Sequence, residues 1–599
     1  MPPSRRHFLA GTAVAVGAAA LLSRTAHQDA VADPAEAEGG DDAGRRGPNF
    51  VVIVADDLGF GEIGAYGQRL MRTPHLDRLA QEGLRFTQAY STAPVCAPSR
   101  CSLLTGLHPG HARVRNNPMG DPSATALRDG DTTFAEVLRA RGYRTACIGK
   151  WGLGPEQGGQ PSHPNSRGFE EFFGYITHGH AHNYYPAYLW HNADKVHLPE
   201  NAGGRRASYA PDLFRDRALG FIREHKDEPF LLFLTPNLPH APSDVPSTEP
   251  YDDRPWLAPD KGHAAQVTRL DDYVGAILDE LREHDLTEST IVLVTSDNGP
   301  HEERGFNPDL FVANGGLRGY KRNLYEGGVR VPLIAWSPRR IRPGTSDRPT
   351  QQTDLLPTLA ELAGAPAPRD IDGRSVAALL DGRPADTPAH PYLYWYRLDD
   401  FVTHRADLAE QGRLRRLAEA ARQGRWKAVR FSPGRDRSAP DDEWKVELYD
   451  LRSDPGETAD VADTHPEVAE RMVAFMRDAW AEPYDREPFG LTVGYPNVLL
   501  PGTDHTLTAT LSNGSARPWG RVRLRVETPR GWPVRLVSPR REAVDRLAPG
   551  EQATYEWRIR VPAAAGLARW RAVVTASCVL DGAPLRFSAE RTFGLPARL

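Results

Sequence analysis

The sequence predicts an α/β protein whose mostly parallel central sheet is sandwiched by helices, followed by a small α+β subdomain and an all-β sandwich. Continuous apolar runs at 49–55, 230–234 and 291–294 are typical of strands buried on both faces. Helical segments alternate with these runs, which favours a parallel sheet covered on both sides. From about Leu491, strict alternation of apolar and polar residues replaces the helical pattern.

Length and composition limit the classes of protein to consider. A chain of 599 residues is long for one hydrophobic core, so we expect several domains. The net charge of −5 and the lack of a basic stripe with interleaved aromatic residues give no case for a nucleic-acid partner. The four cysteines are too few and too scattered for a disulfide framework or a zinc site.

The first 32 residues are predicted to be a twin-arginine signal peptide. The twin-arginine pattern Ser4–Leu9 precedes an apolar segment at 8–22, and Ala30–Ala32 offers a small-residue cleavage site. The apolar segment is shorter than the ~20 residues of a spanning helix, so a membrane anchor is the weaker alternative. We therefore expect export by the twin-arginine machinery to the periplasm, cell surface or medium, with no stable membrane span. Residues 33–47 are expected to be a disordered linker.

The catalytic α/β domain is predicted to span 48–385. Its first strand, 49–55, ends in a pair of aspartates. Thr73-Pro74 and Gly83 are typical of the start and end of a helix. Thr133 and Glu136 have the spacing of a capping box, and a strand is expected over 143–148.

A smaller subdomain is predicted at 386–485. We expect a helix over the arginine-rich stretch 408–423, strands at 426–431 and 447–450, and a helix at 465–480.

The last segment, 486–599, is expected to be a β-sandwich of immunoglobulin type because short alternating strands are separated by turn residues. Gly531-Trp532 and Pro549-Gly550 resemble the NEW3 modules appended to bacterial carbohydrate-active enzymes. No sugar-binding motif is present in the segment, so a packing or spacing role is at least as consistent with the sequence as ligand binding.

The stretch Cys96–Arg100, continued by Leu103–Gly106, is the most specific motif in the chain. Pro98 and Ser99 favour a helix start, so Cys96 is expected just ahead of a helix that runs through Leu104. Amide groups at that end of a helix favour an anion. The alternative is that Cys96 is a buried apolar thiol.

Polar residues follow the predicted parallel strands, where ligands gather in such sheets. These residues are Asp56, Asp57, Lys150, His240, Asp297 and Asn298. The aspartates and the asparagine supply only oxygen ligands, which suits Ca²⁺, with Mg²⁺ as second choice. Each alone could be a strand-end cap or a turn residue, but two such pairs at two strand ends favour a metal.

These motifs resemble the type I sulfatases of the alkaline phosphatase superfamily, over about residues 48–482. The resemblance implies that Cys96 is oxidised to Cα-formylglycine (3-oxoalanine) by a formylglycine-generating enzyme. One hydroxyl of the hydrated aldehyde would attack sulfur, the alcohol of the ester would leave, and a covalent sulfate hemiacetal would remain. Deprotonation of the second hydroxyl would then expel sulfate and regenerate the aldehyde. It further implies a sulfuric ester hydrolase that acts on a sulfated carbohydrate or an aryl sulfate.

The same resemblance implies a role for each site residue. The implied metal ligands are Asp56, Asp57, Cys96, Asp297 and Asn298. Arg100 would orient the aldehyde hydrate, and Lys150 and Lys321 would bind sulfate oxygens. His240 would be the general acid for the leaving oxygen, because a neutral-range pKa suits that step.

One position departs from the family. Many sulfatases have a histidine that contacts the formylglycine where this chain has Gly152. The candidates for a replacement base are His108, which we favour, and the cluster His178, His180 and His182. That cluster and His301 are also predicted to form a sugar subsite, with an ordered surface loop as the equal alternative.

Two other functions remain open at this point. A phosphomonoester, phosphodiester or phosphonate hydrolase could use the same fold and nucleophile. A non-catalytic carbohydrate-binding relative could carry a decayed site, with Gly152 as its mark.

Overall fold

The computed structural model describes residues 47–118, 121–128, 130–435 and 437–481, and then 489–494, 502–513, 518–528, 532–539, 543–548, 551–563, 569–580 and 583–594. The predicted signal peptide (1–32) and the predicted linker (33–47, except Gly47) lie outside the described residues. Gly531 and the Pro549-Gly550 pair also lie outside them.

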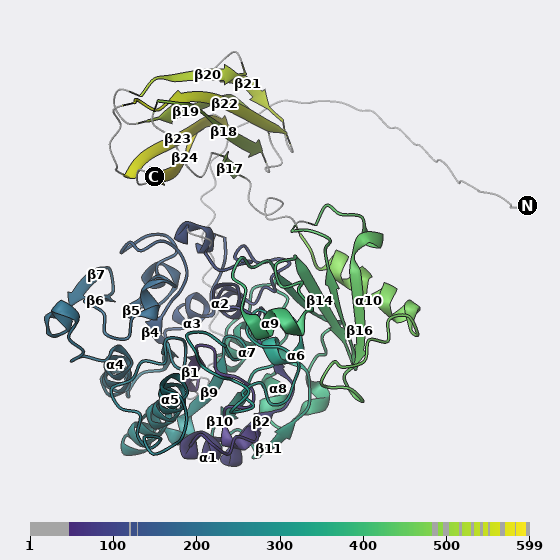
Figure 1. Cartoon of the computed structure of the whole chain (residues 1–599). Coiled ribbons are helices and arrows are strands. Elements are labelled where there is room, and N and C mark those ends of the chain that lie inside the picture. Colours follow the sequence, from purple (N-terminus) through teal and green to yellow (C-terminus); the bar gives the residue numbers. More distant parts are fainter. Residues whose placement is uncertain are drawn as a thin grey trace, which may run out of the picture. The chain divides into compact units, whose positions relative to one another are not determined.

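A large mixed sheet forms the centre of the main domain (Figure 1). In spatial order its strands are β11 (Gly344–Ser346), β2 (Leu84–Phe86), β10 (Leu333–Trp336), β9 (Thr290–Ser296), β1 (Asn49–Ala55), β8 (Phe230–Thr235), β4 (Arg144–Lys150), β5 (Glu171–Tyr175), β6 (Tyr188–His191) and β7 (Asp194–His197). Neighbours from β9 to β5 are parallel, whereas β10 and β6 run antiparallel to both of their neighbours. The sheet is therefore parallel in its centre and mixed toward its edges.

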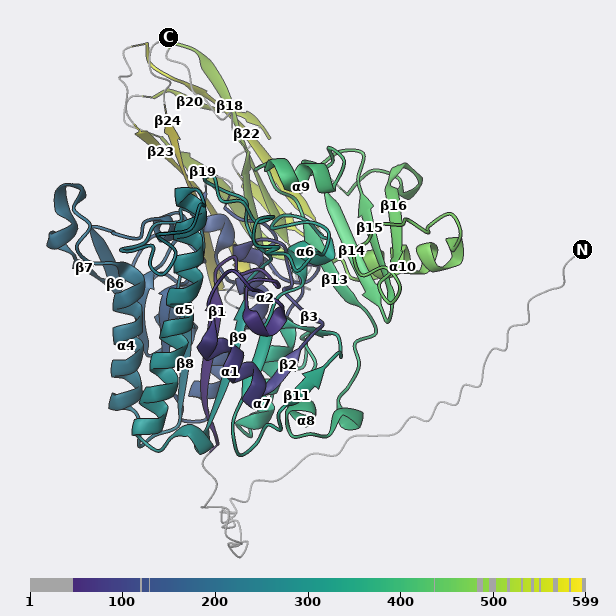
Figure 2. The ribbon, with the colours of Figure 1, turned by 60° about the horizontal axis from the view of Figure 1, so that its bottom comes forward.

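Helices cover both faces of this sheet, as predicted. The side chains of β1 alternate: Val51 and Ile53 belong to one apolar core, and Val52 and Val54 to the other. The first core is closed by α1 (Pro74–Glu82), α4 (Ala210–Glu224) and α5 (Ala258–Glu283), and the second by α2 (Cys96–Thr105), α3 (Phe134–Arg139), α7 (Leu355–Leu362) and α8 (Ala377–Leu380). Helices α4 and α5 run side by side over their face (Figure 2).

The structure confirms several helix and strand boundaries that were predicted from local sequence patterns. Strand β1 has the predicted bounds, and α1 begins at Pro74 and ends before Gly83. At the start of α3 the Glu136 N–H donates to Thr133 Oγ1 at 3.2 Å, and the Thr133 N–H donates to Glu136 Oε2 at 2.8 Å. The predicted capping box is therefore present.

The subdomain contains an antiparallel sheet packed against a helix. Its strands are β13 (Leu393–Arg397), β14 (Ala418–Gln423), β15 (Trp426–Phe431) and β16 (Lys445–Asp450), and its helices are α9 (His404–Ala409) and α10 (Pro466–Asp478). The helix predicted over 408–423 is wrong. Helix α9 stops at Ala409, and Ala418–Gln423 is an inner strand, because pairing with β13 and β15 outweighs its helical composition.

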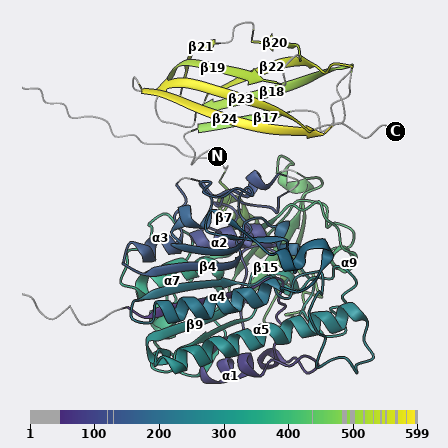
Figure 3. The same cartoon turned by 90° about the vertical axis from the view of Figure 1, so that its left-hand side faces the viewer.

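The C-terminal part contains two four-stranded antiparallel sheets, as predicted for a sandwich (Figure 3). One has the order β17 (Phe489–Gly494), β18 (Asp504–Asn513), β22 (Gln552–Arg560), β20 (Val534–Ser538); the other has β21 (Ala543–Leu547), β19 (Trp519–Glu527), β23 (Arg569–Leu580), β24 (Ala583–Gly594). Alternate residues of both sheets, among them Leu507, Val522 and Tyr555, share one apolar core. In the described part of the chain, no helix has both the length and the apolar character needed to cross a bilayer.

One short helix and a small sheet remain, besides several 3-10 turns. Helix α6 (Glu326–Val329) precedes β10, and β12 (Thr350–Gln351) pairs with β3 (Ala89–Tyr90). All four cysteines are free and buried.

Candidate active site

The carboxyl ends of β1 and β9 bring oxygen ligands together. The two strands are parallel and place Ala55 opposite Ser296, so the residues that follow them meet at one edge of the sheet. There the Asp57 N–H donates to Asp297 Oδ1 at 3.1 Å, and Asn298 Nδ2 donates to Asp57 Oδ1 at 2.7 Å. All these side chains are buried. The register of one strand pair therefore builds the polar cluster.

Cys96 lies against this cluster. Its Sγ is 3.4 Å from Asp56 Oδ1 and 3.9 Å from Asp57 Oδ1. Burial raises the pKa of the Cys96 thiol well above its usual value, although Lys150 and Lys321 act against this. The unmodified side chain is therefore a neutral thiol.

Helix α2 fixes the position of Cys96. The helix begins at Cys96 itself, not after it as predicted, because its N-terminus is capped by another part of the chain. Asn117 Oδ1 accepts the Ala97 N–H at 2.9 Å, while Ser99 Oγ donates to Gln352 instead of capping the helix. The first turn still points its amide groups toward the site, which favours an anion there.

Three buried ion pairs surround the cluster. They join Lys150 Nζ to Asp56 Oδ2 at 2.7 Å, Lys321 Nζ to Asp57 Oδ2 at 2.7 Å, and Arg100 Nε to Asp297 Oδ2 at 2.9 Å. Burial favours the neutral form of Asp56, but the nearby positive charges, with Lys150 the largest, together outweigh it and hold the pKa of Asp56 well below the usual range. Burial and the nearby charge of Asp56 raise the pKa of Asp297 to about 7. Three cationic side chains thus balance three carboxylates.

The donor set fits a hard divalent cation. One ligand atom from each of Asp56, Asp57, Cys96 and His240 lies within 4.8 Å of the others. Asn298 Oδ1 is also buried and has no hydrogen-bond partner among the described residues. A buried oxygen of this kind beside two carboxylates is what a Ca²⁺ or Mg²⁺ ligand requires.

His240 joins the cluster from the loop after β8. Its Nδ1 donates to the Ala241 carbonyl oxygen at 2.6 Å, so Nε2 faces Lys321 Nζ at 3.1 Å as an acceptor. Burial and the charge of Lys321 lower the pKa of His240 to about 3. His240 does not have the neutral-range pKa predicted for a general acid, because a buried ammonium group lies beside it.

The other predicted histidines separate into two groups. The His182 ring stacks on His240 at 4.7 Å, and the His178 ring lies 5.0 Å from His182. His180 turns away and packs on Tyr188 at 4.6 Å. His301 is fully buried behind His240, with Nε2 3.2 Å from a backbone carbonyl. Of these four histidines, only His178 and His182 line the open side of the site.

Comparison with known families gives matches over three ranges of the chain. Residues 48–365 match the sulfatase family, and this match alone covers more than half of the chain. The chain belongs to the sulfatase family. Residues 318–480 match the C-terminal region of N-sulphoglucosamine sulphohydrolase, and residues 499–577 match the NPCBM-associated NEW3 domain of alpha-galactosidase.

Relatives of this sulfatase agree with the assignment. Human arylsulfatase A is 33% identical over 474 residues, which cover 71% of this chain and 86% of the relative. An N-acetylgalactosamine-6-O-sulfatase of Bacteroides thetaiotaomicron is 29% identical, with 71% and 91% covered. The solved structure of Ps i-CgsB in complex with k-i-k-neocarrahexaose has a TM-score of 0.60 at 26% identity and covers 73% of this chain and 94% of that one. The protein is an arylsulfatase-like sulfuric ester hydrolase.

The backbone at Gly152 suits glycine. A Cβ there would make only ordinary contacts, 3.5 Å from Arg100 Cδ and 3.7 Å from Lys150 Cε, but the φ of +81° lies in the left-handed region, where a side chain is strained. A histidine at this position would need a different backbone conformation. The prediction that His108 replaces the missing base is wrong, because His108 does not lie in the site. It follows the far end of α2, about 14 Å along the helix from Cys96, where it contacts Asp372 and stacks on His111.

The open side of the site is a cavity of about 970 Å³, within the range of ligand pockets. Besides the histidines and Lys321, its walls contain residues that the sequence did not single out, namely Asn117, Glu303, Arg322 and the segment 398–405. Arg322 follows the predicted Lys321 in the sequence, and Glu303 lies two positions after the predicted His301. Both could therefore have been predicted as site residues. No local signal identifies the segment 398–405, because it comes from the subdomain.

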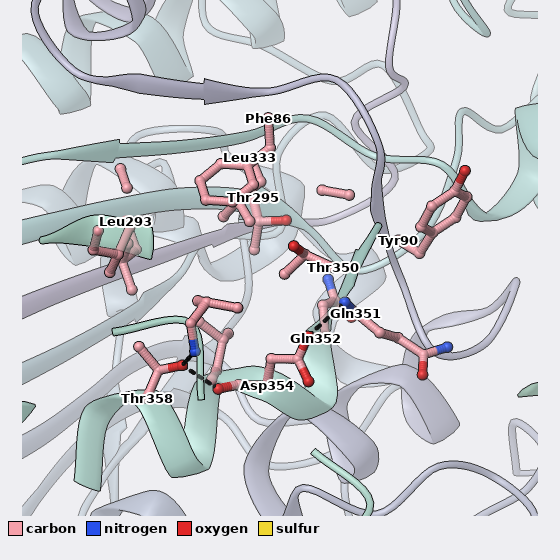
Figure 4. Close-up of a pocket in the computed structure, with 15 residues that line it drawn as sticks. Phe86, Tyr90, Leu293, Thr295, Leu333, Thr350, Gln351, Gln352, Asp354 and Thr358 are labelled. Atoms are coloured by element: carbon pink, nitrogen blue, oxygen red, sulfur yellow. Dashed lines mark hydrogen bonds between the residues drawn. The ribbon is translucent and has the colours of Figure 1, made fainter. Parts of the chain in front are cut away.

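A second cavity lies between the sheet and α7 (Figure 4). Its volume of about 20 Å³ holds at most a water molecule, and Phe86, Leu293 and Leu333 line it. Asp354, at its edge, accepts the Gln351 N–H at 2.9 Å. This cavity is a packing feature and too small for a substrate.

Proposed function

We propose that this sulfatase releases sulfate from a sulfated carbohydrate or an aryl sulfate with Cys96 converted to formylglycine. A formylglycine-generating enzyme would carry out the conversion, and Ca²⁺, or Mg²⁺ as second choice, would bind beside it. The single observation that carries the proposal is the unpartnered Asn298 Oδ1, which lies beside the carboxylates that contact Cys96. Asp56, Asp57 and Asp297 would complete the ligand set with Asn298 and residue 96.

The aldehyde hydrate and the cation would supply a nucleophilic hydroxyl and positive charge next to the sulfuryl oxygens. The side chains around them have separate tasks. Lys150 and Lys321 are close enough to influence the charge on residue 96, and each would bind a sulfate oxygen. Arg100, held by Asp297 and by the Lys150 carbonyl at 2.7 Å, would orient residue 96.

His240 Nε2 would donate a proton to the leaving oxygen after taking one from the Lys321 ammonium group, which lies 3.1 Å from it. The His182 ring, stacked on it, is the nearest predicted candidate for the base that Gly152 does not provide. Because the lysines and Arg100 already balance the three carboxylates, a bound divalent cation would leave the site positive and would favour an anionic sulfate.

We further propose that the chain is exported by the twin-arginine machinery. The support is the Arg5-Arg6 pair ahead of an apolar segment. Replacing both arginines by lysine should keep the precursor in the cytoplasm, as cell fractionation would show. Export that continues unchanged would contradict this assignment.

The test of the enzyme combines mass spectrometry with kinetics. The peptide that contains residue 96 should carry an aldehyde in place of the thiol, and Cys96→Ala should abolish sulfate release from 4-methylumbelliferyl sulfate. Cys147→Ala, which alters another buried cysteine, is the matched control and should stay active. An active enzyme that retains its Cys96 thiol contradicts the proposal. Faster turnover of p-nitrophenyl phosphate or phenylphosphonate would favour the phosphate or phosphonate hydrolase instead.

A further inference from the structure

One wall of the active-site cavity contains an arginine between two carboxylates. Arg322 Nη1 lies 2.9 Å from Glu303 Oε1, and Arg322 Nε lies 3.3 Å from Asp399 Oδ2. Arg322 is only 6% exposed. Its φ of +84° is in the left-handed region, a conformation that a non-glycine residue keeps only where its surroundings impose it. The structure therefore fixes this guanidinium at the cavity wall.

The hydrogen-bonding capacity of this group is not used up. None of these close contacts has hydrogen-bond geometry. Within the described ranges, Arg322 Nε and Nη1, Glu303 Oε1 and Asp399 Oδ2 are buried without a hydrogen-bond partner. The N–O distances of 2.9 and 3.3 Å leave no room for another group between these atoms. Arg322, Glu303 and Asp399 nevertheless line the cavity, where hydroxyl groups, which both donate and accept, can hydrogen-bond these side chains.

The arginine is next to the place where sulfate would bind. Arg322 follows Lys321, and Glu303 Oε1 lies 3.5 Å from Lys321 Nζ. The same ammonium group donates to Asp57 at 2.7 Å. A ligand group that Arg322 and its carboxylates bind from the cavity would therefore belong to the ring that bears the sulfate.

The subdomain segment that supplies Asp399 is fastened to the catalytic domain. Glu302 accepts the N–H groups of Arg405 and Ala406, both at 2.8 Å, at the start of α9. The Phe401 N–H donates to Asp399 Oδ1 at 2.9 Å. These contacts hold the segment beside Arg322, so this wall is built from both parts of the chain.

The charge and shape of the wall limit what can bind. One guanidinium with two carboxylates is negative in sum around Arg322. Of the other arginines that line the cavity, Arg405 is paired with Glu302 and Asp309, and Arg304 is solvent-exposed. A second sulfate or a carboxylate on the ring would therefore be disfavoured. The Phe401 ring lies 4.7 Å from the Arg322 guanidinium and is 55% exposed, so one side chain offers an apolar surface to the ring of a sugar.

We infer that Arg322, Glu303 and Asp399 bind the free hydroxyls beside the sulfate on a neutral, monosulfated sugar, and that Phe401 packs against its ring. This inference rests on the proposed function, because it places the sulfate at Lys321. It selects neutral sugars over aryl sulfates and over sugars with a second charged group.

The test compares kcat/KM among three kinds of probe. The neutral probes are the 4- and 6-sulfates of galactose and N-acetylgalactosamine, the charged probe is glucosamine 2-N,6-O-disulfate, and the probe without a sugar ring is 4-methylumbelliferyl sulfate. At least one neutral sugar should exceed the disulfated one at least tenfold. Arg322→Gln and Asp399→Asn should each lower the ratio of sugar to aryl kcat/KM at least tenfold. Arg425→Gln is the matched control, since Arg425 also pairs with an aspartate and an aromatic ring, but outside the cavity, and it should leave that ratio unchanged.

Equal losses on sugar and aryl probes would overturn the inference, because Arg322 would then act on the sulfate. Preference for the disulfated sugar would also overturn it. If the wild-type enzyme releases no sulfate from any probe, the proposed function fails. The subsite is then tested by saturation-transfer NMR with galactose and N-acetylgalactosamine. Binding that Arg322→Gln removes supports the inference, and binding that it leaves unchanged, or no binding at all, refutes it.

Discussion

Lys427→Met should destabilise the protein strongly and in a pH-dependent way. Lys427 is fully buried on β15, and its Nζ lies 2.9 Å from Glu326 Oε1 and 3.0 Å from Glu457 Oε1. Both glutamates are also fully buried, and Glu457 accepts the Glu326 N–H at 2.6 Å. Lys427 therefore pairs with both carboxylates at the contact between the subdomain and helix α6, and Arg330 Nη1 also lies 3.5 Å from Glu326 Oε2.

The magnitude follows from this arrangement. Removing one partner of a buried ion pair costs about 3–5 kcal/mol, because the remaining charge is left uncompensated. Burial raises the pKa of Glu457 to about 7. Burial acts the same way on Glu326, but the combined charges of Lys427, Arg422 and Arg330 outweigh it and lower the pKa of Glu326 to about 2. We expect Lys427→Met to lower the free energy of unfolding by about 3–5 kcal/mol at pH 8.

The sign of the pH effect follows from Glu457. A carboxyl group whose pKa is raised by folding binds more protons in the folded state, so its contribution to stability falls as the pH rises from its unfolded value through about 7. Without Lys427 the pKa of Glu457 rises further. One additional unit of pKa corresponds to about 1.4 kcal/mol, so the loss in the variant should be about 1 kcal/mol smaller at pH 5 than at pH 8.

The assay is urea unfolding of the full chain, followed by tryptophan fluorescence at pH 5 and pH 8. Hydrogen exchange of the peptide 418–431, which covers β14 and β15, assigns the transition to the subdomain. Lys445→Met is the matched control, since Lys445 lies on the neighbouring strand and its pair with Asp460 at 3.1 Å is half exposed. It should cost less than about 1 kcal/mol. A loss below about 1 kcal/mol for Lys427→Met, or an equal loss at both pH values, would refute this reasoning.

Three further outcomes are expected. Dialysis against EDTA should abolish sulfate release without changing the circular dichroism spectrum, and Ca²⁺ should restore more activity than Mg²⁺; full activity after chelation would contradict the proposed metal. Thr133→Ala removes the capping box with Glu136 and should lower the free energy of unfolding by about 0.5–2 kcal/mol in urea, whereas an unchanged midpoint would show that the cap is not stabilising. His182→Gln should lower kcat for aryl sulfates at least tenfold because His182 stacks on His240, while His180→Gln, two residues away and facing Tyr188, should stay within threefold; equal effects would refute the placement of the two rings.

Much of the fold could be predicted because its signals are local. The continuous apolar run at 49–55 requires a strand buried on both faces, and Pro74, Gly83 and the Thr133–Glu136 box act within one helical turn. The site could be predicted in part for a different reason. Parallel strands align their carboxyl ends, so the polar residues after 49–55 and 290–296 had to lie close together.

The parallel centre of the sheet, the residues at its catalytic edge and the family of the chain follow from the amino-acid sequence. Three features depend on the packed domain: 418–423 is a strand, His182 faces the site while His180 does not, and segment 398–405 reaches Arg322. The difference lies in the distance along the chain over which each signal acts. Strand and helix signals act over a few neighbouring residues, whereas the direction of a loop side chain and the docking of a distant segment depend on contacts that form only when the whole domain packs.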